Sequence, residues 1–284
     1  MIKGDFSLDN TNYCKGIAII LMIVHHLFWN VPGIGTMIGD ISLSQRIGIV
    51  GKVCVSIFLF LSGFGLYKST KENFSVKYYY STKLFKLYMN YLFIVCTSVI
   101  IIFMFFYDKV FNVISSGMQL IKDILLSLTG LQYIIDYGGI NGAWWFMTVI
   151  IVCYLIFPII KIGLERYKTK FLIMIFIMSF SSLIPLEGVK IFDIISWIFP
   201  FVFGIYVAQY NLLDWIKKEI NNKNTVIKKE ILIILLLAVI IIRQEVSAQG
   251  FIGLRLDYLL SFIIILSVYV FWENIEMSKK VYVT

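Results

Sequence analysis

The only two histidines of the chain, His25 and His26, stand at the far end of an apolar run that opens near Lys15. If this run is a helix, the eleven residues from Lys15 to His26 advance about 1100°, or three turns plus about 20°, and roughly 16 Å along the axis. Lys15 and His26 therefore share one face, whereas His25 points about 80° away from it. An imidazole at this depth could act as a general base on an alcohol or as an acyl-accepting nucleophile. The spacing also allows a histidine that only hydrogen-bonds a neighbouring helix or lies near the outer interface.

A second candidate site is a pair of lysines, Lys83 and Lys86, at the inner end of another apolar run. On a helix, the i, i+3 spacing puts both ammonium groups on one side. Two cations at a cytoplasmic mouth could hold the phosphates of a donor molecule. Ordinary anchoring by basic residues on the cytoplasmic side is the competing interpretation.

Ser62 and the tryptophans Trp144 and Trp145 are candidate substrate contacts. Ser62 lies in the stretch 58–65, whose two glycines allow close helix packing, so Ser62 could line a cavity or hydrogen-bond a partner helix. Trp144 and Trp145 begin another apolar run at its outer end, where they could form a sugar platform or an interfacial belt. No acidic cluster and no HExxH motif is present, so we expect no metal site.

The elements that must position these residues are transmembrane helices. Of the 284 residues, 60% are hydrophobic and 15% are charged, and the mean hydropathy is +0.87. A soluble domain usually carries about 25% charged residues, so this composition excludes a soluble protein, and it excludes intrinsic disorder too. A span needs about 20 apolar residues, so we predict an all-α polytopic membrane protein with about 8–10 transmembrane helices. Eight apolar runs are evident: 12–30, 48–67, 87–107, 144–162, 171–185, 191–210, 230–243 and 256–272.

The basic residues indicate a cytoplasmic N-terminus. With spans alternating from that start, 18 of the 25 Lys and Arg residues fall on inner segments and 7 on outer ones. This positive-inside distribution accounts for the net charge of +8 without a nucleic-acid partner. The longest loop, 108–143, departs from the alternation, because its short run 121–135 carries Asp123 and favours a re-entrant or interfacial helix. The four cysteines are far apart, without a CxxC motif, and we expect buried thiols.

Taken in order, these features resemble the acyltransferase family 3 membrane proteins, which transfer acyl groups, often acetyl from cytoplasmic acetyl-CoA, to sugars of cell-surface polysaccharides and related acceptors. The resemblance covers residues 13–272 and depends on five motifs. They are Lys15-Gly-Ile-Ala with His26 eleven positions after the lysine, the stretch 55–64, the pair Lys83 and Lys86, Trp145-Phe146 on a run that ends at Pro158, and Phe203-Gly204-Ile205. Lysine stands at 15, 83 and 86, where the family usually has arginine, and lysine cannot make the bidentate fork to a phosphate. The chain also stops where the family continues into a further helix, so we expect 1–284 to be a single acyltransferase domain without that helix.

The resemblance implies a multi-pass enzyme of the cell membrane, an O-acetyltransferase with acetyl-CoA as donor and a sugar or polysaccharide hydroxyl as acceptor. Its expected partners are acyl-CoA, the glycan acceptor and membrane lipid, with no metal. The expected site residues are His26 and Lys15 for catalysis, Lys83 and Lys86 for the donor phosphates, and Ser62, Trp144 and Trp145 for the acceptor. The residues alone leave two other classes open. One is a secondary transporter or lipid-linked sugar flippase with the histidine pair as a proton relay, and the other is a non-catalytic sensor or scaffold.

Overall fold

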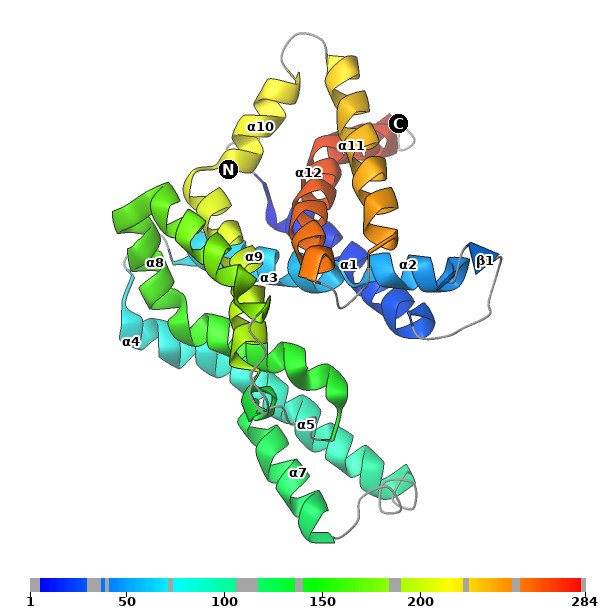
Figure 1. The fold of residues 1–284 in the computed structure, drawn as a ribbon. Helices are drawn as coiled ribbons and strands as arrows, with labels where there is room; N and C mark the ends of the chain where they lie inside the picture. The colour runs from blue at the N-terminus through cyan, green and yellow to red at the C-terminus, as the bar shows by residue number, and fades with distance from the viewer. Residues whose placement is uncertain are drawn as a thin grey trace. The chain divides into compact units, whose positions relative to one another are not determined.

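The computed structural model describes residues 6–29, 37–38, 41–70, 74–105, 117–135, 140–183, 190–221, 225–246 and 251–281. The chain divides into two compact units. The colour bar of Figure 1 gives the residue numbers by which each unit can be followed. The first unit comprises Met1–Lys68 and Phe199–Thr284, and the second comprises Ser69–Ile198. Each unit is described by itself.

The first unit is built from helices, with one short antiparallel ladder in which two residues of β1 pair with two of β2. Helix α1 packs against α2, and α11 lies beside α12 (Figure 1). The elements are α1 (Leu8–Phe28), β1 (Met37–Ile38), β2 (Ile41–Ser42), α2 (Leu43–Gly51), α3 (Cys54–Ser69), the second half of α9 (Ile191–Gln209), α10 (Leu212–Asn221), α11 (Thr225–Gln244) and α12 (Phe251–Val281).

Serine side chains set the starts of the two helices that later carry the site. Helix α1 begins where Ser7 Oγ accepts the Asn10 N–H at 3.2 Å. Helix α2 begins with a capping box, in which Ser42 Oγ accepts the Gln45 N–H at 3.4 Å and Gln45 Oε1 accepts the Ser42 N–H at 3.1 Å. These caps satisfy N–H groups that a helix start leaves without an intrahelical partner.

The second unit holds the middle of the chain. Its elements are α4 (Val76–Tyr79), the π-helical turn η1 (Tyr80–Leu84), α5 (Phe85–Phe105), α7 (Gly117–Thr129), the short turns η2 (Gln132–Ile135) and η3 (Gly142–Trp144), α8 (Trp145–Met178), η4 (Ser179–Leu183) and the first half of α9. Helix α8 consists of two arms, because Lys168 has φ 49° and ψ −129°, outside the helical range. The arms meet closely: a Cβ at Gly163 would lie 2.5 Å from the ring of Phe171.

The prediction of an all-α polytopic membrane protein is confirmed. Within the described residues, six helical segments are long and apolar enough to cross a membrane. The segments are Leu8–Phe28, Leu43–Ser69, Val76–Phe105, Gly142–Ser181, Ile191–Gln209 and Ile252–Phe271. The described residues of the eight predicted apolar runs lie mainly on helices, and run 48–67 is interrupted at 52–53, between α2 and α3. The runs 144–162 and 171–185 lie mainly on the two arms of α8, and 230–243 lies on α11. Helix α7 lies inside the loop 108–143, and a re-entrant or interfacial position for it stays a prediction.

Candidate functional site

The predicted catalytic residues lie on one continuous helix, α1, and both are exposed. Asn10, Cys14 and Ala18 form the buried row of α1. Seven residues after Ala18, close to two turns, His25 continues this row and is half-buried. Lys15 and His26 lie on the neighbouring face, which is open in the structure. The packed imidazole is therefore His25, and the exposed one is His26.

His25 packs on the carboxyl end of α2. Its Nδ1 lies 2.7 Å from the carbonyl oxygen of Gly48. That oxygen has no helical partner in the usual position, because the Lys52 N–H donates to Ile49 O at 3.3 Å, three residues back instead of four. The last carbonyls of a helix need partners from outside it. His25 supplies one, and this contact joins α1 to α2.

Two glycines allow the close approach of α2 to α1. A Cβ at Gly51 would lie 2.6 Å from Leu21 O and 3.0 Å from His25 N. A Cβ at Gly48 would overlap the backbone of Phe28 and the next residue. Any larger side chain at either glycine would push the two backbones apart, so both glycines are needed for the His25 contact.

The segment Leu43–Ser69 is apolar along its length but its helix is broken between Gly51 and Cys54, where α2 ends and α3 begins. Non-helical backbone at membrane depth is tolerated only where protein buries it or where it lines a water-filled cavity. In secondary transporters, discontinuous helices commonly form the substrate site. The break lies next to His25, through Gly51, and so marks this end of α1 as the candidate site.

A buried ion pair joins the end of α11 to the start of α12. Arg243 Nε lies 2.6 Å from Asp257 Oδ1, Arg243 Nη2 lies 3.1 Å from Asp257 Oδ2, and both side chains are fully buried. Arg243 Nη1 also donates to Val246 O at 2.9 Å. Arg46 of α2 forms an ion pair with Glu245, which stands two residues after Arg243 in the sequence.

Sequence reasoning missed this ion pair. Arg243 ends the apolar run 230–243 and Asp257 lies in the next run, 256–272, and nothing in the sequence pattern pairs them. The available signal was a carboxylate inside the apolar run 256–272, since ionisable residues within a span are functional candidates by default.

In the second unit, the predicted donor-binding lysines lie at a widened helical turn. Lys83 is half-buried in η1, and Lys86 is exposed in the first turn of α5. π-Helical turns are rare and occur frequently at functional sites. The regular i, i+3 geometry expected from the sequence therefore applies only from α5 onward, because Lys83 precedes it in η1.

The turn η1 is held by two tyrosine hydroxyls on the arm of α8 that contains Pro158. Proline has no N–H, so the carbonyl of Tyr154, four residues earlier, lacks its helical donor. Tyr79 OH donates to Tyr154 O at 2.8 Å. Tyr80 OH donates to the next carbonyl, Leu155 O, at 2.7 Å. The proline thus creates the acceptor that fixes the start of η1.

The candidate acceptor residues differ in exposure. Trp144 is buried in a core cluster, with its ring 6.1 Å from that of Tyr91 in a T-shaped contact. Trp145 is half-buried, and its ring centroid lies 5.3 Å from that of Trp197 and 5.9 Å from that of Tyr133. Trp145 thus offers more open surface than Trp144.

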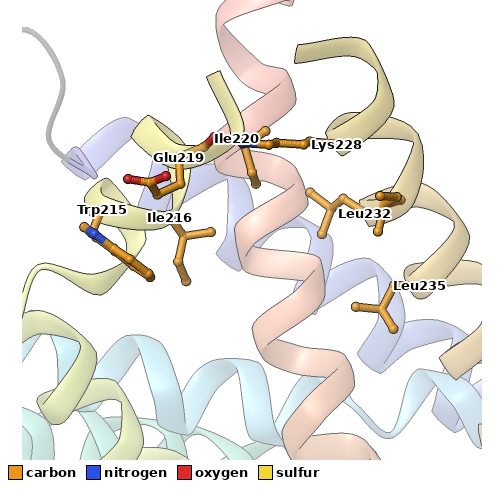
Figure 2. A pocket seen from close by; sticks show the side chains of 8 residues that line it. Trp215, Ile216, Glu219, Ile220, Lys228, Leu232 and Leu235 are labelled. Carbon is orange, nitrogen blue, oxygen red and sulfur yellow. Dashed lines mark hydrogen bonds between the residues drawn. The ribbon is translucent and has the colours of Figure 1, made fainter. Parts of the chain in front are cut away.

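A separate apolar pocket of about 310 Å³ lies between α10 and α11 of the first unit, and none of the predicted site residues lines it. Figure 2 shows aliphatic side chains of the two helices around it, with Trp215, Glu219 and Lys228. Lys228 Nζ donates to Glu219 O at 2.6 Å. Among the described side chains, no three His, Cys, Asp or Glu residues gather as ligands for a metal ion.

A family model described as an acyltransferase domain matches residues 8–278, nearly the whole chain. The chain belongs to acyltransferase family 3. The family predicted from the five motifs is confirmed, and the protein is a multi-pass membrane acyltransferase. No curated protein and no solved structure matched the chain.

Two motifs of this acyltransferase pack directly on each other within the first unit. A Cβ at Gly63 in α3 would overlap the carbonyl oxygen of Phe201 in α9. In return, a Cβ at Gly204 would overlap the carbonyl oxygen of Phe60. Small residues let membrane helices approach backbone to backbone. Ser62, beside this contact, is half-buried.

Proposed function

We propose that this acyltransferase is an O-acetyltransferase of the cell membrane that moves acetyl from cytoplasmic acetyl-CoA to a hydroxyl of a cell-surface polysaccharide or another extracytoplasmic sugar. The observation that carries the proposal is the exposed imidazole of His26, beside the packed His25 and the break between α2 and α3, in a chain of this family. Ionisable side chains at membrane depth are costly in free energy, so an open imidazole there is a functional candidate by default.

His26 supplies the base in the proposed reaction. Its lone pair takes the proton of the sugar hydroxyl as the oxygen attacks the thioester carbonyl. The C–S bond then breaks, the acetyl ester forms, and the proton leaves with CoA as the thiol. A covalent acetyl-histidine is the alternative route, and it needs the same lone pair. Lys15, on the same face of α1, tunes or orients the His26 ring in this proposal.

Lys83 and Lys86 hold the CoA phosphates in this proposal. Lysine acts on a phosphate as a point charge with three rotatable donors, so η1 and not the side-chain shape must set the geometry. Trp145 contacts the acceptor in this proposal, whereas Trp144, the other residue expected there, is buried in the core cluster. We propose Ser62, next to Gly63, as a further contact to the sugar acceptor.

The proposal is tested by acceptor labelling in membranes. Membranes with the wild-type chain receive acetyl-CoA with an isotopically labelled acetyl group, and the isolated glycan is examined for label. The expected result is alkali-labile label on glycan from wild-type membranes and none from His26→Ala membranes that contain equal amounts of protein. Equal labelling by both would end the assignment.

A further inference from the structure

We propose that His25 is a positioning residue for the acyl transfer: by donating a hydrogen bond from Nδ1 to Gly48 O, it fixes the last turn of α1 and with it the direction of the His26 ring. This inference rests on the proposed function of His26. It gives a role to the second of only two imidazoles in the chain.

The hydrogen bond fixes the tautomer of His25. A carbonyl oxygen can only accept, so Nδ1, at 2.7 Å from Gly48 O, must carry the proton. In the neutral ring, Nε2 then keeps its lone pair and cannot donate. The Gly48 carbonyl is a suitable acceptor, because it is one of the last carbonyls of α2 and Lys52 N–H bonds to Ile49 O instead.

Contacts on both sides hold the His25 ring. The Trp29 ring stacks on it with a centroid distance of 5.8 Å and an interplanar angle of 23°. The Trp29 N–H donates to His25 O at 2.9 Å and closes the last turn of α1. On another side, the His26 ring meets His25 edge to face at 5.4 Å. The His26 ring thus rests against a ring that is itself bonded to α2.

The His25 contact affects the direction of the His26 ring, because consecutive side chains on a helix point about 100° apart and turn together with the helix. His26 lies on the open face of α1, and among the described contacts its ring is positioned by His25. A rotation of the last turn would move the His26 ring, and a misplacement of about 1 Å can lower a rate about 100-fold.

Two substitutions separate positioning from chemistry. Asparagine places an amide N–H near the position of Nδ1 and keeps the donor to Gly48 O, whereas leucine removes it. We expect His25→Leu to lower kcat on the order of 100-fold, with the KM for acetyl-CoA unchanged, and His25→Asn to restore most of kcat. Wild-type kcat in His25→Leu overturns the inference. So does a His25→Asn variant as impaired as His25→Leu, because the imidazole itself would then be required.

A spectroscopic measurement tests the same contact without any activity. In protein labelled with ¹⁵N-histidine there are only two rings, and the His25→Asn sample identifies the signals of each. We expect His25 to be the Nδ1–H tautomer at neutral pH, with a bare Nε2, and a finding of the Nε2–H tautomer overturns the inference. Full activity of His26→Ala would instead remove the proposed function, and the tautomer would still decide whether His25 holds Gly48.

Discussion

Arg243 and Asp257 form a two-point ion pair, with Nε–Oδ1 and Nη2–Oδ2 distances of 2.6 and 3.1 Å and no exposed side-chain surface. The pair joins the end of α11 to the start of α12. Removing one partner of such a pair leaves a charge buried without compensation.

Either Arg243→Met or Asp257→Leu is expected to destabilise the protein by about 3–5 kcal/mol. The double substitution Arg243→Met with Asp257→Leu should recover most of that loss, because two apolar side chains leave no buried charge. Denaturant unfolding in detergent micelles measures all three. A double variant as unstable as the worse single variant would contradict this account of the pair.

Helices α3 and α9 depend on the reciprocal glycine contact. Gly63→Ala should destabilise the protein by about 1–3 kcal/mol, because the added Cβ overlaps Phe201 O and the backbones must separate. The matched control is Gly65→Ala in the same helix, since nothing lies within 4 Å of a Cβ there. Thermal unfolding of both variants checks the contact, and equal effects would count against it.

The tyrosine contacts of η1 lend themselves to a double-mutant cycle. Tyr79→Phe removes only the hydroxyl that donates to Tyr154 O and should cost about 1 kcal/mol of unfolding free energy. Pro158→Ala supplies an N–H that can satisfy the same carbonyl from within α8. In the Pro158→Ala background, Tyr79→Phe should therefore cost less. An equal cost in both backgrounds would show that the proline and the hydroxyl act independently.

Donor binding by the lysines makes a charge-specific prediction under the proposed function. Lys83→Gln should raise the KM for acetyl-CoA about tenfold, equivalent to about 1.4 kcal/mol, while kcat changes little. Lys83→Arg should keep or improve the KM, because arginine adds the bidentate fork. Lys77→Gln, an exposed lysine on α4, is the control. If Lys77→Gln and Lys83→Gln raise KM equally, general positive charge and not this site attracts the donor.

The helices follow from the sequence because each apolar run must satisfy its own backbone in a bilayer, and the described residues of the eight predicted runs are mainly helical. Their irregularities depend on neighbours that a single run does not reveal. The break after Gly51 is paired with His25 from another helix, and η1 is held by carbonyls near Pro158. Lys168 adopts a positive φ, which residues other than glycine seldom take. A lysine at this position therefore gave no signal that α8 would bend there.

The sequence likewise predicted the helix that carries the candidate site but not how each of its side chains packs. The phase of an ideal helix correctly put Lys15 and His26 on one continuous α1. It could not distinguish the packed histidine from the open one, because that depends on where α2 meets α1. Trp144 illustrates the same limit, since a tryptophan at the start of a span fits a belt, a platform or the core cluster that surrounds it here.

The central claim is that the imidazole of His26 carries acyl transfer, and free CoA release measures this most directly. Purified protein in lipid nanodiscs is incubated with acetyl-CoA and glycan acceptor, and mass spectrometry quantifies CoA and acetylated glycan. The account predicts equal amounts of both products from wild type, and a drop to the level of protein-free nanodiscs for His26→Ala at unchanged unfolding temperature. Wild-type rates from His26→Ala would contradict the claim.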